Sequence, residues 1–424
     1  MTLKIGQAKD WKETDGVIMG VPIGHDGSAA AERVLLYSHD TFGLGHLRRS
    51  RTIATALTDA NQDRSALIVT GSPIAGRFDF AERIDHVRLP GVVKQPDGSY
   101  TSLNLNMDID EMVQLRGAII AATARQFAPD LVIVDKEPWG FRGELRETLE
   151  AMQEAGARIV LGVRDVLDSP EVMLDEWARK NAQEAVERFY DEIWVYGIPQ
   201  ICQPLEGLGL SARMRARTRY TGYLRREAPK WPAAGASELP DEPYILVTTG
   251  GGGDGNALVD WVLRAYEADA TLTDHALLVY GPFMPAADRA VFDARVAKLG
   301  GRVTAISFNA RFERLLAGAR GVVAMGGYNT FCEILSTDTP AIIVPRTKPR
   351  REQAIRAEAA EELGLIRMLL PERDGKGADV MAHAIKALAY QRRPSEREIA
   401  GLLDGLDVIT AVAEGVTHLA VAGE

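Results

Sequence analysis

Cysteine and long apolar runs are scarce in this 424-residue sequence. The two cysteines, Cys202 and Cys332, lie far apart, which argues against a disulfide framework and against a cysteine zinc site. We find no run of about 18 uninterrupted apolar residues, so no membrane span is expected. The formal net charge of −10 excludes a protein built to coat nucleic acid or an acidic membrane.

The composition is otherwise that of an ordinary globular protein with an ample core, at 46% hydrophobic and 25% charged residues. The N-terminal sequence lacks the apolar stretch of a signal peptide, and the low cysteine content fits a reducing compartment. We therefore expect a cytoplasmic protein, with peripheral association at the inner face of the membrane left open.

Short apolar runs alternate with helical patterns along most of the chain. Continuous apolar strands separated by helices predict parallel sheets that are covered on both faces. The strands are expected at 33–38, 65–70, 130–135, 157–163 and 192–197, and again at 244–249, 275–281, 302–307, 321–325 and 340–345.

This pattern divides the chain into two units of comparable size. Residues 1–30 show no sustained periodicity and are expected to form a poorly ordered lead-in. Residues 31–224 form the first α/β unit, and 225–243, rich in proline and small residues, form a linker. Residues 244–424 form the second unit, whose last helix can cross back to the first. The sequence thus predicts two doubly wound, Rossmann-like domains that face each other, with ligands beyond the carboxyl ends of the strands.

Three glycine-rich loops stand at predicted strand ends: "TFGLGHLRRS" (41–50), "TTGGGGDGNAL" (248–258) and "MGGYNTFCEIL" (325–335). Glycine followed by a helix suits phosphate, because backbone N–H groups and the helix dipole both favour an anion. Tight turns need glycine as well, so each loop alone is weak support for a ligand. None of them matches the dinucleotide fingerprint or the P-loop.

The third loop and the segment after the last predicted strand carry polar residues with two interpretations. Thr330 and Glu333 have the spacing of a capping box, which the spacing alone slightly favours, but Glu333 could also accept hydrogen bonds from a ribose. Glu352 and Gln353 follow a basic loop and offer acceptors and donors for sugar hydroxyls.

Other charged residues stand near predicted strand ends. Asp135 and Glu137 are a candidate base or acceptor-binding pair, or ordinary polar residues leaving a strand. Arg164 and Asp165 can pair with each other. The segment 211–226 interleaves six arginines with tyrosines, which suits a solvated surface or an anionic lipid headgroup.

In this order, the three loops and Glu352–Gln353 resemble the GT-B glycosyltransferases, most closely their MurG-like branch. The resemblance is strongest over 321–364, with Glu352 standing where that branch has glutamine. It implies a diphosphate site at residues 326–330, a ribose contact at Glu333 and a sugar contact at Glu352–Gln353. The implied donor-binding residues are Gly43, Gly45, Arg48, Gly251, Gly252, Gly253, Asp254, Gly255, Phe308, Asn309, Gly326, Gly327, Tyr328, Asn329, Thr330, Glu333, Glu352 and Gln353.

The resemblance also implies a chemistry. His46 matches the histidine of the family's first loop and would be the general base on an acceptor hydroxyl, although it could instead be a packed helix residue. Arg48, Arg49 and Arg51 would add positive potential near the leaving diphosphate, so neither metal nor cofactor is implied beyond a UDP-sugar co-substrate.

The leading hypothesis is an inverting, metal-independent hexosyl- or N-acetylhexosaminyltransferase. Its partners would be a nucleotide sugar and a glycan, lipid-linked or small-molecule acceptor, without nucleic acid. A nucleotide-sugar hydrolase, an epimerase and a non-catalytic nucleotide-sugar-binding scaffold remain alternatives.

Overall fold

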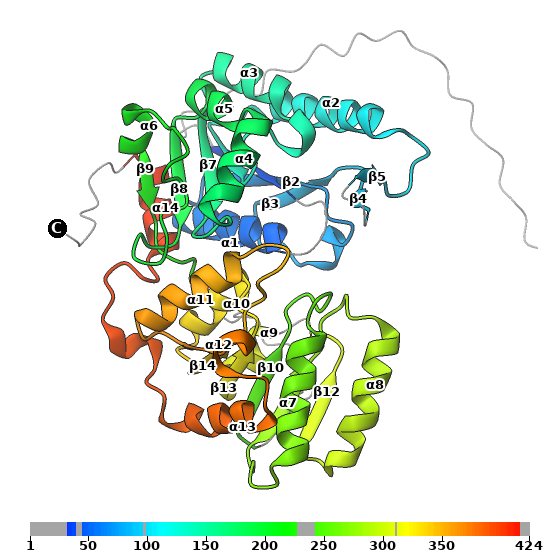
Figure 1. Cartoon of the computed structure of the whole chain (residues 1–424). Helices are drawn as coiled ribbons and strands as arrows, with labels where there is room; N and C mark the ends of the chain where they lie inside the picture. Colours follow the sequence, from blue (N-terminus) through cyan, green and yellow to red (C-terminus); the bar gives the residue numbers. More distant parts are fainter. Residues whose placement is uncertain (1–31, 40–44, 96–98, 227–241, 310–311, 416–424) are drawn as a thin grey trace, which may run out of the picture.

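The computed structural model describes residues 32–39, 45–95, 99–226, 242–309 and 312–415. The predicted lead-in at 1–30, most of the predicted linker at 225–243, and Gly43 lie outside the described residues. Within those ranges the chain forms two α/β units, each built on a parallel sheet (Figure 1).

The first unit contains a seven-stranded sheet in the order β3-β2-β1-β6-β7-β8-β9, in which every neighbouring pair is parallel. Its strands are β1 (Arg33–Ser38), β2 (Ser65–Thr70), β3 (Ile84–Arg88), β6 (Leu131–Asp135), β7 (Arg158–Arg164), β8 (Glu192–Tyr196) and β9 (Thr218–Tyr220). A short antiparallel hairpin joins β4 (Val92–Lys94) to β5 (Tyr100–Ser102).

Helices cover this sheet, and one of them returns from the far end of the described chain. The helices are α1 (Gly45–Ala60), α2 (Ile109–Phe127), α3 (Arg146–Glu154), α4 (Pro170–Lys180), α5 (Ala182–Phe189), α6 (Ala212–Ala216) and α14 (Gly405–Ala413). Helix α14, red in Figure 1, packs against α1 of the first unit. The backbone carbonyl of Val412 in α14 accepts a hydrogen bond from Arg158 in β7 at 2.8 Å.

The second unit contains a six-stranded parallel sheet in the order β12-β11-β10-β13-β14-β15. Its strands are β10 (Tyr244–Thr248), β11 (His275–Val279), β12 (Val303–Ile306), β13 (Ala319–Ala324), β14 (Ala341–Ile343) and β15 (Arg367–Met368). Its helices are α7 (Asn256–Ala268), α8 (Ala286–Val296), α9 (Phe312–Ala317), α10 (Tyr328–Ser336), α11 (Glu352–Glu362), α12 (Pro371–Asp374) and α13 (Ala378–Ala387). Short 3-10 helices occur in both units: η1 (Ala75–Arg77) and η2 (Phe141–Gly143) in the first, and η3 (Ala297–Leu299), η4 (Leu388–Tyr390) and η5 (Pro394–Arg397) in the second part of the chain.

The strands at the centre of both sheets are buried along almost their whole length, because helices lie on both faces. This explains their continuous apolar sequences, such as "LVIVD" in β6 and "YILVT" in β10. The predicted fold class, two doubly wound Rossmann-like units, is confirmed. The carboxyl ends of β1, β6 and β7 in the first unit, and of β10, β13 and β14 in the second, lead into the loops that carry the candidate site.

Candidate active site

The candidate base lies at the start of α1, where the chain leaves the central strand β1. His46 Nδ1 lies 2.5 Å from Asp135 Oδ2, at the end of the neighbouring strand β6. Arg49, one turn further along α1, donates to both Asp135 oxygens, from Nη2 at 2.6 and 2.7 Å and from Nε at 3.0 Å. The predicted base His46 is therefore hydrogen-bonded to Asp135. The two residues, which the sequence offered as separate candidates, form one pair.

The ionisation of Asp135 fixes which nitrogen of His46 carries the proton. Burial raises the pKa of Asp135, but the charges of Arg49 and His46 outweigh this and hold the pKa below its ordinary value. An ionised carboxylate only accepts hydrogen bonds, so His46 donates from Nδ1. The Nε2 atom of the neutral ring is then the basic one. The ring of His39, which sequence analysis did not single out, lies edge-on at 5.8 Å between centroids.

Arg48 reaches across to the second unit. Its Nη2 donates to Glu313 Oε1 at 2.6 Å and also to Glu333 Oε1. Glu333 is 1% exposed, and its Oε2 has no hydrogen-bond partner among the described residues. Burial raises the pKa of Glu333, and the nearby carboxylate of Glu313 adds to this against the opposing charge of Arg48. The side chain is therefore a buried acceptor with one unused oxygen.

The capping-box interpretation of Thr330 and Glu333 is wrong. Helix α10 begins at Tyr328 with Gly327 as its N-cap, and no side chain caps it. Thr330 thus lies inside the first turn and Glu333 in the second, where neither can serve as an N-cap. Gly326, with φ of 78°, makes the turn before the helix, because a Cβ there would lie 2.6 Å from a methyl carbon of Ile343.

An arginine that the sequence analysis passed over stands at the start of α10. Arg226 Nη2 donates to Asn329 Oδ1 at 2.8 Å, while its Nη1 donates to Thr52 in α1. Asn329 Nδ2 in turn donates to the carbonyl of Gly45 at 3.2 Å. The buried Nε of Arg226 has no partner among the described residues, so a cation lies beside the N-terminus of α10. The sequence does not single out Arg226, because this residue lies in an arginine-rich stretch and its spacing does not distinguish it from arginines at the surface.

The glycine loop between β10 and α7 has two kinds of glycine. A Cβ at Gly252, whose φ is 89°, would lie 2.3 Å from the carbonyl oxygen of Tyr280, and one at Gly255 would lie 2.2 Å from Thr249. These two are therefore required by packing. A Cβ at Gly253 would meet no atom within 4 Å, which leaves the loop open there, and one at Gly251 would only touch the Phe283 ring at 3.4 Å.

The predicted sugar-binding pair lies at the start of α11. Glu352 is 3% exposed; its Oε1 accepts a hydrogen bond from Arg346, and its Oε2 has no partner among the described residues. Arg346 also donates from Nη1 to Asp254 at 2.7 Å, which ties the 250–255 loop to Glu352. Gln353 Oε1 accepts from the backbone N–H of Arg346 at 3.0 Å. Burial raises the pKa of Glu352, but the charges of Arg346 and Arg164 outweigh this and lower it.

Phe308 and Asn309 follow β12, and Phe308 is 54% exposed. The remaining first-loop residue, Gly43, lies outside the described residues.

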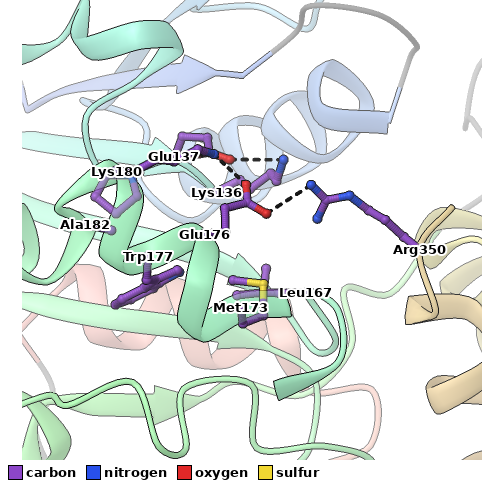
Figure 2. A pocket seen from close by; sticks show the side chains of 10 residues that line it. Lys136, Glu137, Leu167, Met173, Glu176, Trp177, Lys180, Ala182 and Arg350 are labelled. Atoms are coloured by element: carbon purple, nitrogen blue, oxygen red, sulfur yellow. Dashed lines mark hydrogen bonds and ion pairs between the residues drawn. The ribbon is translucent and has the colours of Figure 1, made fainter. Parts of the chain in front are cut away.

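Glu137 belongs to a separate ion-pair network, shown in Figure 2. Its Oε2 accepts from Lys180 at 2.7 Å, and Lys180 also donates to Glu176 at 2.5 Å. Arg350, which comes from the second unit, donates to Glu176 at 3.1 Å. These charged residues line a pocket together with the apolar side chains of Leu167, Met173 and Trp177.

Two further expectations are corrected by the contacts. Asp165 does not pair with Arg164: it accepts from Arg356 Nε and Nη2, both at 2.6 Å, and from Tyr223 at 2.7 Å. The segment 211–226 is not a surface throughout, because Tyr223 is fully buried and Arg226 lies between the units.

In the described part of the chain, no three or more His, Cys, Asp or Glu side chains are arranged to hold a metal ion. No helix within those same ranges is long and apolar enough to cross a membrane.

The chain is similar to known proteins in one domain model and in its fold. Residues 245–391 match the model of the glycosyltransferase family 28 C-terminal domain, whereas no curated protein sequence matches the chain significantly. Among similar solved structures, the calicheamicin glycosyltransferase CalG4 is 19% identical, with a TM-score of 0.53 over 91% of this chain and 96% of that one. MurG of Acinetobacter baumannii is 14% identical, with a TM-score of 0.53 over 89% and 94%. UGT2 of Phytolacca americana, complexed with UDP-2fluoro-glucose and pterostilbene, is 15% identical, with a TM-score of 0.59 over 93% and 97%.

The two Rossmann-like units thus form the GT-B fold of glycosyltransferases. Within the second unit, residues 245–391 match the glycosyltransferase family 28 C-terminal domain, and the resemblance to MurG-like GT-B glycosyltransferases found in the sequence is confirmed.

Proposed function

We propose that the protein is an inverting glycosyltransferase that moves a sugar from a UDP-sugar to an acceptor hydroxyl without a metal ion. The observation that carries the proposal is a pair of buried carboxylates in the second domain, Glu333 and Glu352, each with one oxygen that has no partner among the described residues. Leaving a buried acceptor unsatisfied is unfavourable, and the hydroxyls of a ribose and of a sugar are donors that would satisfy both.

The leaving group would lie at the start of α10. The N–H groups of the first turn of a helix have no partners within it, and the helix dipole favours an anion there. Arg226 places a second positive charge at the same point. Together they supply the stabilisation that a metal ion gives a departing diphosphate in other enzymes. The UDP-2fluoro-glucose in the UGT2 complex is consistent with a UDP donor on this fold.

His46 would supply the base in the first domain. With Nδ1 donating to Asp135, its Nε2 accepts the proton of the acceptor hydroxyl as that oxygen attacks the anomeric carbon. The bond to the UDP oxygen breaks on the opposite face, so one displacement inverts the configuration. Asp135 stabilises the imidazolium that forms, and Arg49 keeps Asp135 ionised.

The test is nucleotide release from a panel of nucleotide sugars that vary in base and in hexose or N-acetylhexosamine. We expect release of UDP only when cell extract supplies an acceptor, and we expect it to persist in EDTA. Release without an acceptor would identify a nucleotide-sugar hydrolase, and loss of release in EDTA that Mg²⁺ or Mn²⁺ restores would contradict the metal-free mechanism. Absence of nucleotide-sugar binding would indicate a scaffold.

A further inference from the structure

The side chain of Arg164, the last residue of β7, has no hydrogen bond or ion pair with any described residue. Its Nε is buried without an acceptor. Burial, together with the charges of Arg49 and Arg356, lowers its pKa to about 10. Leaving the Nε donor of a cation buried without an acceptor is unfavourable, so this partly buried side chain calls for an anion that the described residues do not provide.

Each described carboxylate near Arg164 accepts its hydrogen bonds from another cation, and none accepts one from Arg164. The pairs are Asp135 with Arg49, Asp165 with Arg356, and Glu352 with Arg346. The charges of Glu352 and Asp165 act on Arg164, but among the described residues neither carboxylate accepts a hydrogen bond from its guanidinium.

A second cation lies beside it. Lys136 follows β6, the strand next to β7, and its backbone N–H donates to the carbonyl of Gly162 in β7 at 2.8 Å. Among the described residues, its Nζ pairs at 3.2 Å with Glu137, whose other oxygen already accepts from Lys180. Burial lowers the pKa of Lys136. The charge of Glu137 opposes this effect, whereas the charge of Arg164 adds to it. Lys136 and Arg164 thus stand at the ends of two adjacent strands, and the charge of one acts on the other.

We propose that Lys136 and Arg164 bind a carboxylate or phosphate group carried by a substrate, distinct from the nucleotide diphosphate. The inference rests on the proposed function. Arg164 ends the strand next to β6, whose Asp135 holds the candidate base, and the charge of Glu352, the candidate sugar contact, partly offsets the lowering of the Arg164 pKa. The group therefore belongs either to the acceptor or to the transferred sugar. A planar guanidinium beside an ammonium suits either anion.

The experiment uses the full chain in two states: saturated with UDP for the phosphate titration, so that the diphosphate site is filled, and free of nucleotide for the UDP-sugars. Calorimetric titration with inorganic phosphate tests an acceptor phosphate, and the affinities of UDP-glucose and UDP-glucuronic acid test a sugar carboxylate. We expect saturable phosphate binding, or preference for the acidic donor, and a loss of about 10- to 100-fold in Arg164→Met and Lys136→Met. Arg179→Ala, an exposed cation in α4, is the matched control and should leave both measurements unchanged.

Thermal unfolding guards against a merely structural effect. Because the Arg164 side chain has no hydrogen-bond partner among the described residues, Arg164→Met should keep or raise the unfolding temperature, and a clear decrease would overturn the inference. So would the absence of both phosphate binding and donor preference, or phosphate binding that UDP abolishes. Should UDP itself fail to bind, the proposed function fails, while phosphate titration of the unliganded chain still tests Lys136 and Arg164.

Discussion

Asp135 determines what His46 can do at the scale of the single residue. A histidine at the start of a helix is disfavoured as a cation, because the helix dipole is positive there. The buried, ionised carboxylate of Asp135 compensates for this and orients the ring at the same time. The sequence placed both residues at strand ends but could not show that they meet, since only the pairing of β1 with β6 brings them together.

Replacing His46 with alanine should slow sugar transfer by about 10²- to 10⁴-fold, the usual effect of a general base. The affinity for UDP should stay close to that of the native protein, because the proposed nucleotide contacts lie in the other domain. Single-turnover kinetics and calorimetry separate the two effects. Asp135→Asn is the companion variant and should also slow transfer, and near-native turnover of the His46 variant would remove this residue from the mechanism.

Glu333→Ala should weaken UDP binding by about 1–3 kcal/mol, because the variant loses the acceptor for the ribose hydroxyls. Since Gly327 and not a side chain caps α10, the unfolding temperature should not show the loss of a helix cap. Calorimetry with UDP measures the first effect and thermal unfolding the second. Thr330→Val is the control for the discarded capping box. Unchanged UDP affinity would show that Glu333 serves only Arg48.

The pKa of Glu137 gives a prediction for acid stability. Burial raises this pKa, but the charges of Lys136 and Lys180 outweigh it and lower the pKa to about 2. Because the folded pKa lies below the unfolded one, the stabilisation is present above about pH 4.5 and is lost as the pH falls toward 2. Glu137→Gln should remove up to about 3 kcal/mol at neutral pH and flatten this acid dependence. Urea unfolding at a series of pH values measures both, and a parallel pH profile in the variant would contradict the assignment.

At the scale of elements, the central strands could be predicted because burial on both faces leaves continuous apolar sequences. Every predicted strand range overlaps an observed strand. The strands that escaped prediction lie at sheet edges or are short: β3 reads "IDHVR", and β15 has only two residues. Their sequences are partly polar because one side faces solvent, so periodicity gives little signal.

The start of α10 shows why spacing alone misassigned a cap. Thr330 and Glu333 have the separation of a capping box, but the separation does not say where the helix begins. Gly326 turns the chain two residues before Tyr328, so the helix is already formed at Thr330. Glycine provides no side-chain signal for a start, and the packing of Gly326 against Ile343 is a tertiary contact that the sequence does not display.

The 250–255 loop provides a matched pair of substitutions. Gly252→Ala should lower the free energy of unfolding by about 1–3 kcal/mol, since its φ is positive and its Cβ would meet the Tyr280 carbonyl. Gly253→Ala should change it by less than about 0.5 kcal/mol, yet weaken UDP-sugar binding, because the new methyl group enters the open side of the loop. Chemical unfolding and calorimetry distinguish them. Equal destabilisation by both variants would contradict the division of the loop into packed and open glycines.

At the scale of the whole molecule, buried ion pairs connect the two domains. Arg356 in α11 holds Asp165 at the end of β7, and both side chains are almost fully buried. Breaking such a pair leaves a charge without compensation, so Arg356→Met should cost about 3–5 kcal/mol, measured as a lower unfolding midpoint. Adding Asp165→Asn should restore part of this loss. If the double variant is no more stable than Arg356→Met, the pair does not carry the effect.

The position of helix α14 constrains the order in which the two domains can complete folding during synthesis. Ile409 and Val412 complete a hydrophobic cluster that includes Leu47 and Ile53 of α1, although the entire second domain lies between them in sequence. Helix α1 emerges from the ribosome early, but helix α14, which packs against it, is not available until translation has passed residue 413. Domains generally fold in the order of their synthesis. Here the first domain emerges first but keeps an apolar patch exposed while the second domain is synthesised. The first domain is therefore the last to complete its core.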